Sequence, residues 1–448
     1  MLLWRSRKPF DRKRWLLCAS VGLIISVAAT VLRAEDLCAG LFTGTERVAV
    51  PAVAKPPFMK YYREPAFGTR VIRISNAGRG EVFKPAYSTM QAWNADESLL
   101  LLYRSGPDSG HLLLDGKTYE PFRELDIVPS DIEEVFWSHT DPDSLYYISK
   151  RSTDYGAFLK YSVKADKSTV LKSFSDICGK KGLPTNGNDP QMQSHDDTLF
   201  GFRCQLDEES YLMFTYNLDS GEVVYAPLEE ESGWEPWTAP IPGPSGDRLW
   251  LQGMVIKPDL EQVTLRHDMA KHSEHASVGL THDGQDAWFQ VAFDPSPDDC
   301  DDDLWRGVGH LVEHNMQTGE CRPVVNEARG YPYTSSGTHI SALAHKRPGW
   351  VAMSSMGYGS FEYFSNKRKA PALFSEIYLV NTDPENEVVC RLAHHRSYAK
   401  DAESADYKPY FGEAHATISP SGTRILFGSD WYDSGSVDAY VIELPAYH

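Results

Sequence analysis

Several signatures of familiar enzyme chemistry are missing from this sequence. There is no Cys-x-x-Cys spacing, which argues against a zinc ribbon or a thioredoxin-type redox site. The chain also has no phosphate-binding loop, no Gly-x-Gly-x-x-Gly after a strand and no His-Glu-x-x-His. A Gly-x-Ser-x-Gly string is absent as well, which argues against the serine nucleophile of an α/β-hydrolase. Function must therefore be sought in the organisation of the chain.

Basic residues are also scarce. The 448 residues include 44 Lys and Arg against 62 Asp and Glu, so the formal net charge is −18. This charge argues against a general affinity for nucleic acid or anionic membranes, and an anionic ligand would need a local basic patch. Hydrophobic residues make up 42% of the chain and charged residues 24%, which are ordinary globular values and exclude disordered and fibrous classes.

The first 34 residues have the pattern of an export signal. Six basic residues precede residues 15–32, an uncharged stretch of 18 residues. This length lies at the transmembrane threshold, so the leader is either a cleaved signal peptide or a retained signal anchor. We expect a periplasmic or extracellular protein that contacts the inner membrane only through an uncleaved leader. The leader holds seven basic residues and one acidic residue, so the body without it carries −24.

The cysteine count agrees with export. Cys18 lies in the leader, and the other six cysteines are an even number that allows disulfide pairing. Proximity along the chain favours Cys178 with Cys204 and Cys300 with Cys321. Buried free thiols are the alternative.

The body of the chain repeats one pattern seven times. Each copy has a short apolar segment, a tight turn rich in Asp, Ser, Pro and Gly, and then a run of β-formers. The turns lie at residues 94–98, 141–143, 196–197, 244–247, 282–284, 346–349 and 418–423. A second hairpin follows several copies, as at residues 211–225, 309–325 and 376–392.

Four strands in each of seven units predict an all-β fold, the seven-bladed β-propeller. The last unit, which ends at residues 438–444, lacks a fourth strand, and residues 69–74 can supply one and close the ring. We expect a leader at residues 1–34, an N-terminal extension at 35–66 and the propeller at 67–448. An eight-bladed ring or an irregular sandwich is the alternative architecture.

Residues 413–431, Glu-Ala-His-Ala-Thr-Ile-Ser-Pro-Ser-Gly-Thr-Arg-Ile-Leu-Phe-Gly-Ser-Asp-Trp, resemble the terminal-blade motif of TolB-like propellers. The segment is also similar to propeller polysaccharide lyases, the oligogalacturonate lyases and ulvan lyases. The turn motif behind this resemblance specifies the fold, and many such propellers have no catalytic activity.

Three histidines occupy one repeated position. His275, His339 and His415 each begin a His-x-Ser/Thr string ahead of a turn, in the fifth, sixth and seventh units. Since the innermost strands of a propeller begin around one mouth of the channel, we expect the three imidazoles to converge there and bind Mn²⁺ or Zn²⁺. Oligogalacturonate lyases, which this chain resembles, hold manganese with histidines and a glutamine, and Gln191 or Gln193 is a candidate fourth ligand. The alternative is that each histidine hydrogen-bonds its own Ser or Thr.

Loops near this mouth supply basic and aromatic residues that suit an acidic sugar. In β-elimination from a uronate, a cation neutralises the carboxylate, a base removes the C5 proton and an acid protonates the leaving oxygen. We expect Arg396 or the metal to neutralise the carboxylate, His394 or His395 to act as base, and Tyr333 or Tyr410 to act as acid. The remaining candidates for substrate binding are His272, Arg329, Tyr331 and Lys408.

Residues 294–303 concentrate six carboxylates in ten positions, which would suit Ca²⁺ but lack EF-hand spacing. A solvated acidic loop is the alternative.

These patterns predict an exported propeller that binds and cleaves a uronic-acid-containing polysaccharide by metal-assisted β-elimination, as a carbon-oxygen lyase. We expect a monomer with an acidic carbohydrate as its partner and no nucleic acid. The alternative is a non-catalytic periplasmic propeller that binds a protein or peptide, as TolB-like propellers do.

Overall fold

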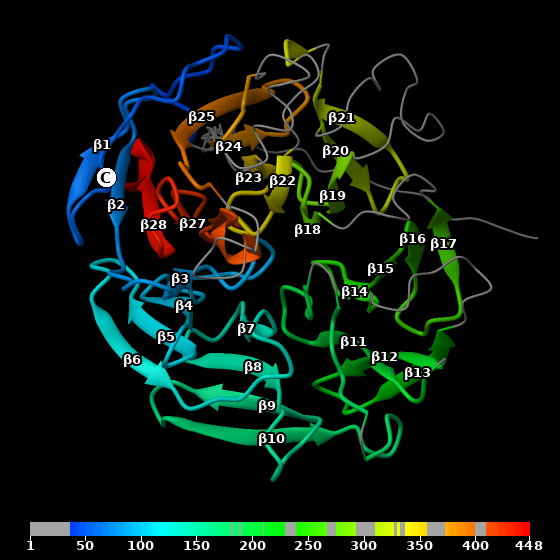
Figure 1. The fold of residues 1–448 in the computed structure, drawn as a ribbon. Helices are drawn as coiled ribbons and strands as arrows, with labels where there is room; N and C mark the ends of the chain where they lie inside the picture. Colours follow the sequence, from blue (N-terminus) through cyan, green and yellow to red (C-terminus); the bar gives the residue numbers. More distant parts are fainter. Residues whose placement is uncertain are drawn as a thin grey trace, which may run out of the picture. The chain divides into compact units, whose positions relative to one another are not determined.

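Seven antiparallel sheets repeat along the described chain. The tight turns predicted from the sequence precede the second strand from the centre in six sheets, and in the three-stranded sheet the turn precedes Leu199–Gln205, its innermost strand. The computed structural model describes residues 36–180, 182–187, 190–208, 210–228, 239–266, 275–292, 310–326, 329–331, 337–355, 372–398 and 409–448. The sheets surround a common centre, and one edge strand of each sheet faces it (Figure 1). The predicted seven-bladed β-propeller is confirmed.

The first three blades come from the N-terminal half of the chain. Blade 1 contains β3 (Val82–Lys84), β4 (Leu99–Ser105), β5 (Gly110–Asp115) and β6 (Pro121–Leu125). Blade 2 contains β7 (Val135–Trp137), β8 (Ser144–Ile148), β9 (Ala157–Ser162) and β10 (Lys167–Ser173). Blade 3 contains β11 (Leu199–Gln205), β12 (Tyr211–Asn217) and β13 (Val223–Leu228), and a single bridge from Gln193 to Phe200 marks its inner edge.

Blades 4 to 7 follow in order. Blade 4 contains β14 (Ile241–Pro242), β15 (Leu249–Leu251), β16 (Met254–Ile256) and β17 (Val263–Arg266). Blade 5 contains β18 (Ala276–Leu280), β19 (Asp286–Ala292), β20 (His310–Asn315) and β21 (Cys321–Val325). Blade 6 contains β22 (Gly337–Ser341), β23 (Trp350–Ser355), β24 (Glu376–Asn381) and β25 (Val388–His394). Blade 7 contains β26 (Thr417–Ile418), β27 (Arg424–Ser429), β28 (Asp438–Glu443), β2 (Arg70–Arg73) and β1 (Tyr61–Arg63).

Alternation along the strands builds a hydrophobic core between each pair of neighbouring blades. In β4, Leu101 packs toward blade 2, whereas Leu100 and Leu102 pack toward blade 7. Successive side chains of a strand point to opposite faces, so each sheet supplies apolar groups to both neighbours. Among the described residues, each blade interface has a large cluster of this kind, including the interface between blades 7 and 1.

Blade 7 combines strands from both ends of the described chain. β2 pairs with β28 in the register Arg70↔Glu443 to Arg73↔Tyr440, and β1 pairs with the other edge of β2. Ile72 of β2 packs in the core between blades 7 and 1, and Val71 of β2 packs in the core between blades 6 and 7. The strand predicted at residues 69–74 thus contributes to two interfaces.

Disulfides hold two parts of the fold. The predicted bond between Cys178 and Cys204 is present, and a second bond joins Cys38 to Cys390 across 352 residues. Cys321 is also disulfide-bonded, while Cys300 lies outside the described residues.

Searching the described part of the chain reveals no helix that is both long and apolar enough for a membrane span. The predicted leader and the acidic segment at residues 294–303 lie outside the described residues.

Candidate metal centre at the propeller mouth

The three repeated histidines lie together where the innermost strands of blades 5, 6 and 7 begin. His275 directly precedes β18, His339 lies in β22, and His415 lies two residues before β26. The ring centroids of His275 and His339 are 4.9 Å apart, and those of His339 and His415 are 4.2 Å apart. We call this end of the channel the first mouth.

The Ser and Thr residues of the repeated strings bond to the next blade. Ser277 accepts a hydrogen bond from the main-chain N–H of Ala342 (3.1 Å), and Ser341 accepts one from Ile418 (3.1 Å). Thr417 donates to the main-chain oxygen of Met90 in blade 1 (3.0 Å). These hydroxyl groups therefore tie blades 5, 6, 7 and 1 together, rather than holding the histidines of their own strings.

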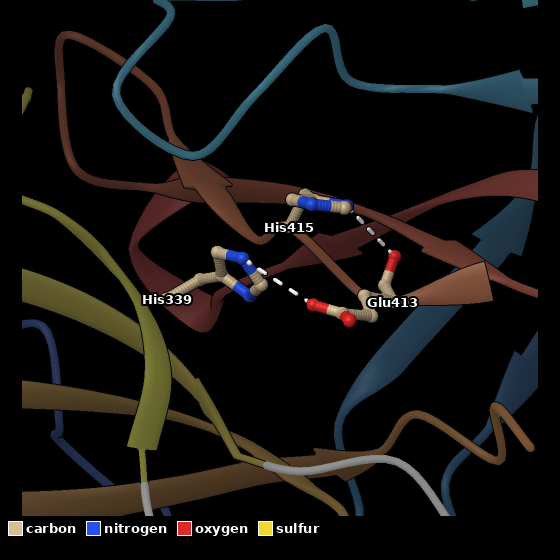
Figure 2. A group of neighbouring side chains, drawn as sticks. All are labelled: His339, Glu413 and His415. Carbon is tan, nitrogen blue, oxygen red and sulfur yellow. Dashed lines mark hydrogen bonds and ion pairs between the residues drawn. The ribbon is translucent and has the colours of Figure 1, made fainter. Parts of the chain in front are cut away.

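Glu413 completes a compact group of ligand atoms with His339 and His415. One atom from each residue can be chosen so that all three lie within 4.8 Å of one another. Nε2 of His339 is 3.5 Å from Oε2 of Glu413, and Nδ1 of His415 is 3.0 Å from the main-chain oxygen of Glu413. Figure 2 shows both imidazoles beside this glutamate. The buried Nε2 of His415 has no hydrogen-bond partner among the described residues.

The protonation states in this group suit a cation. Burial lowers the pKa of His339 and of His415 well below the usual range, and it lowers the pKa of His275 to about 4. The three imidazoles are therefore neutral near pH 7 and have nitrogen lone pairs to donate. Burial also raises the pKa of the half-buried Glu413 carboxyl to about 7. A divalent cation would favour the ionised carboxylate and so oppose this effect of burial.

Lys84 of blade 1 lies beside the histidine group. Its side chain is completely buried, and Nζ donates a hydrogen bond to the main-chain oxygen of Ala86 (3.0 Å). The same Nζ is 3.8 Å from Oε1 of Glu133 and 5.0 Å from the ring centroid of Tyr410. Burial lowers the pKa of Lys84 to about 8, so part of the population is neutral at mildly alkaline pH.

Two tyrosines place their rings close to the histidines, and one of them, Tyr410, also faces Lys84. Tyr87 places its ring 5.4 Å from His339 and 5.3 Å from His415. The ring of Tyr410, a predicted site residue, is 4.7 Å from His415, and its hydroxyl donates to Glu133 (2.5 Å). Burial raises the pKa of Tyr410, which keeps its hydroxyl protonated.

The three residues predicted to neutralise the substrate and act as base lie in the interior instead. His394, His395 and Arg396 are all buried. Both terminal nitrogens of Arg396 donate to Glu64, at 2.6 and 2.8 Å, and His394 lies between Glu64 and Glu376 at 3.7 Å from each. This placement does not fit their predicted roles, because Glu64 already compensates the charge of Arg396 and His394 faces two buried carboxylates.

The predicted substrate-binding residues are dispersed. Arg329 forms an ion pair with Glu387, and Tyr331 is buried in the core between blades 5 and 6. His272, Tyr333 and Lys408 lie outside the described residues.

The two candidate glutamines differ: Gln191 uses both ends of its amide in hydrogen bonds, whereas Oε1 of Gln193 has no hydrogen-bond partner among the described residues. Gln191 bonds both the main-chain N–H and the main-chain oxygen of Val278 in blade 5 (2.6 and 2.9 Å). Gln193 donates to the main-chain oxygen of Trp137 and to Asp197 (2.9 and 2.7 Å). Both side chains link blades around the channel.

Sequence reasoning missed Glu413 and Lys84. The only local signal for Glu413 is its position two residues before His415, which places both on one face of an extended segment. Lys84 belongs to β3, whereas the repeat pattern places the first inner strand of blade 1 at residues 90–93. The structure adds Lys84 to the site because it shows where the inner strand of blade 1 starts. It adds Glu413 because the carboxylate lies beside His339 and His415.

Comparisons with known proteins support the fold. No model of a known protein family matches the sequence, and no protein with a curated description matches it. Among solved structures, an oligogalacturonate lyase in complex with manganese matches with a TM-score of 0.58 and 16% identity, over 86% of this chain and 96% of that chain. The β-propeller domain of Myceliophteria thermophila Cps50 (Swd1) matches with a TM-score of 0.43 and 11% identity, over 80% of this chain and 97% of that chain. At 16% identity, the similarity to the lyase structure shows the fold alone.

Proposed function

We propose that the protein is a lyase that cleaves a uronic-acid-containing polysaccharide or oligosaccharide by metal-assisted β-elimination. The observation that carries the proposal is the group of His339, Glu413 and His415 at the first mouth, next to the buried Lys84. The similarity to the fold of a manganese-containing oligogalacturonate lyase supports the choice of substrate class.

The residues at the first mouth fit a divalent metal such as Mn²⁺ or Zn²⁺. Two neutral imidazoles and one carboxylate are donors that both metals accept, and the buried Nε2 of His415 has no other partner among the described residues. His339, His415 and Glu413 would hold the ion, and His275 borders it. A bound divalent metal supplies charge neutralisation at the substrate carboxylate, which acidifies the C5 proton.

Lys84 and Tyr410 are our candidates for proton transfer. Neutral Lys84 can accept the C5 proton at Nζ, since its pKa of about 8 lies near the working pH that general-base catalysis favours. The hydroxyl of Tyr410 can donate its proton to the leaving oxygen, and this side chain is 37% exposed. Tyr410 thus keeps the role expected from the sequence, and Lys84 takes the role expected of His394 or His395.

Substrate assays test this proposal. Fragments of pectin, ulvan, glucuronan and alginate would be incubated with the full chain, with and without Mn²⁺ or Zn²⁺, while the ultraviolet absorbance of the unsaturated uronate product is followed. We expect product with at least one polymer, a metal requirement, and loss of activity together with bound metal in H415A. K84M should retain metal but lower kcat/KM by about 10²- to 10⁴-fold.

The matched control is K117M, which changes an exposed lysine in the turn between β5 and β6 of blade 1. It should leave kcat/KM unchanged. Absence of product from all four polymers under every metal condition would overturn the lyase proposal, as would full activity in K84M and H415A.

We also propose that the protein acts after export. Its disulfides, Cys38–Cys390 and Cys178–Cys204, are of the kind that persist in oxidising compartments. Fractionation of the expressing cell tests this, and a purely cytoplasmic protein with reduced cysteines would contradict it.

A further inference from the structure

Three other histidines gather at the opposite end of the innermost strands. His139 follows β7 of blade 2, His195 follows the inner bridge of blade 3, and His345 follows β22 of blade 6. Their ring centroids are 4.7 Å (His139 to His195), 5.4 Å (His139 to His345) and 5.5 Å (His195 to His345) apart. β22 runs from one group to the other, because it contains His339 and ends four residues before His345. We call this end the second mouth.

Hydrogen bonds between blades hold the three turns in place. The carboxylate of Asp197 accepts from the main-chain N–H groups of His139 (3.0 Å) and Thr140 (3.1 Å), which joins the turns of blades 2 and 3. The N–H of His195 donates to Pro244 of blade 4 (3.0 Å), and the N–H next to His345, that of Lys346, donates to Pro420 of blade 7 (3.0 Å). The fold therefore fixes the backbones from which the imidazoles converge.

The spacing of the three rings suits a shared metal ion. With metal–nitrogen bonds of about 2.1 Å and tetrahedral angles, the centroids of ligating imidazoles lie about 5 Å apart. All three side chains are half-buried, so they remain accessible from solvent. Nδ1 of His345 is buried and has no hydrogen-bond partner among the described residues.

The pocket beside these rings supports the assignment of a small ligand. Its wall includes His139 and His195, and its volume of about 30 Å³ matches one or two water molecules. Burial lowers the pKa of all three histidines, to about 3 for His345, which leaves the rings neutral and able to donate lone pairs. A small cation with its remaining water ligands fits this space.

We propose that His139, His195 and His345 form a second divalent-metal site, which clamps blades 2, 3 and 6 across the channel. Three imidazoles without a carboxylate favour Zn²⁺, Cu²⁺ or Ni²⁺ over Mn²⁺, whereas the carboxylate of the first mouth also suits Mn²⁺. Among the described residues, the group whose ligand atoms all lie within 4.8 Å of one another is that of the first mouth, so the imidazole nitrogens of the second mouth lie farther apart. Binding at the second mouth therefore requires the imidazoles to turn about their Cβ–Cγ bonds.

Zinc stoichiometry tests the second site. The full chain would be equilibrated with Zn²⁺, separated from free ion by gel filtration and analysed by elemental mass spectrometry. We expect two zinc ions per chain in the wild type and one each in H195N, H345N and H339N. H339N/H345N should retain none. A Mn²⁺ titration should saturate at one ion in the wild type and in H345N.

The matched control is H282N, because His282 lies in the corresponding turn of blade 5 but faces Asp383 (3.9 Å) instead of the other histidines. It should retain two zinc ions. The thermal midpoint without metal identifies any variant that fails to fold, and H195N and H345N provide independent tests at two turns.

Two results would overturn the second site: a single zinc ion in the wild type that only H339N removes, or two ions retained in both H195N and H345N. The outcome is independent of the lyase proposal, since H345N should keep wild-type activity in the presence of Mn²⁺. Loss of one zinc ion from H345N would support the second site even if no polymer is cleaved.

Discussion

At the scale of single residues, ionisable groups in the interior depend on the partners that the fold gives them. Glu64, Glu376, Arg391 and Arg396 are all buried, and each arginine is held by two nitrogen–oxygen contacts with one glutamate. Because each buried charge has a direct counter-ion, these pairs need no solvent. Glu134 is different, since the groups that donate hydrogen bonds to its carboxylate in the described part of the chain are neutral.

Glu134 should make stability depend on pH. Burial raises its pKa from 4.5 to about 7, although the Ser130 hydroxyl (2.6 Å) and the Asn186 N–H (2.7 Å) donate to it. Between these values the unfolded chain has lost the proton and the folded chain retains it. The contribution of Glu134 to stability is therefore fully present below about pH 4.5 and is lost as pH rises through about 7, by at most about 3 kcal/mol.

E134Q should remove this part of the pH dependence, because its amide is neutral throughout. Thermal midpoints at about pH 5 and pH 8 would be compared between wild type, E134Q and the exposed-site control E120Q. We expect the thermal midpoint to decrease less between the two pH values in E134Q than in the wild type or in E120Q. An equal decrease in all three would contradict the role assigned to Glu134.

At the scale of elements, the segment before β1 is fastened to the edge of blade 6. Cys38 is disulfide-bonded to Cys390 in β25, and the N–H of Arg391 donates to the main-chain oxygen of Phe42 (2.9 Å). The guanidinium of Arg391 also donates to the main-chain oxygens of Gly44 (3.0 Å) and Glu46 (2.5 Å). A disulfide that closes a loop this long restricts the unfolded chain strongly.

Removing this disulfide with C38S/C390S should lower stability by about 2–4 kcal/mol. Hydrogen exchange should increase over residues 36–50, because the disulfide is the covalent link of that segment to blade 6 and its removal leaves the segment held by hydrogen bonds and by the packing of Leu37 and Phe42. The comparison variant is C178S/C204S, in which exchange over residues 36–50 should match the wild type. Faster hydrogen exchange over residues 36–50 in both variants, or in neither of them, would contradict this interpretation.

At the scale of the whole molecule, the seven cores between blades form a closed series. Ile72 of β2 belongs to the core that joins blade 7 to blade 1, together with Leu100 of blade 1 and Val441 of β28. A cavity at this interface removes contacts that connect the two ends of the described chain. The destabilisation that this cavity causes should therefore extend around the ring.

I72A should cost about 2–5 kcal/mol, the usual range for truncating a buried isoleucine. Hydrogen exchange should increase in β15 and β16 of blade 4 as well as in blade 7, because we expect the ring to open cooperatively. V170A, at an exposed position of β10, should cost less than about 0.5 kcal/mol. Faster exchange confined to blade 7 would show that the blades unfold separately.

Much of this architecture can be predicted from the sequence because its signals are local. The turn residues at 244–247 and 418–423 and the period-two apolar pattern after them depend on neighbouring positions along the chain. The same repetition predicted that His275, His339 and His415 occupy equivalent positions, and their rings do lie together. Local pattern also identified Cys178 and Cys204 as partners.

Only the tertiary structure decided which charged groups face the channel and which face the core. Arg396 is paired with Glu64, 332 residues away in the sequence, and no local pattern reveals that such a residue is buried. Lys84, Glu413 and Tyr410 meet the histidines because blades 1 and 7 are neighbours in the ring. His139, His195 and His345 meet across the channel for the same reason. The sequence by itself determined the repeating unit, since turns and strands are local, whereas closing the ring determined the sites, since contacts across a ring are not.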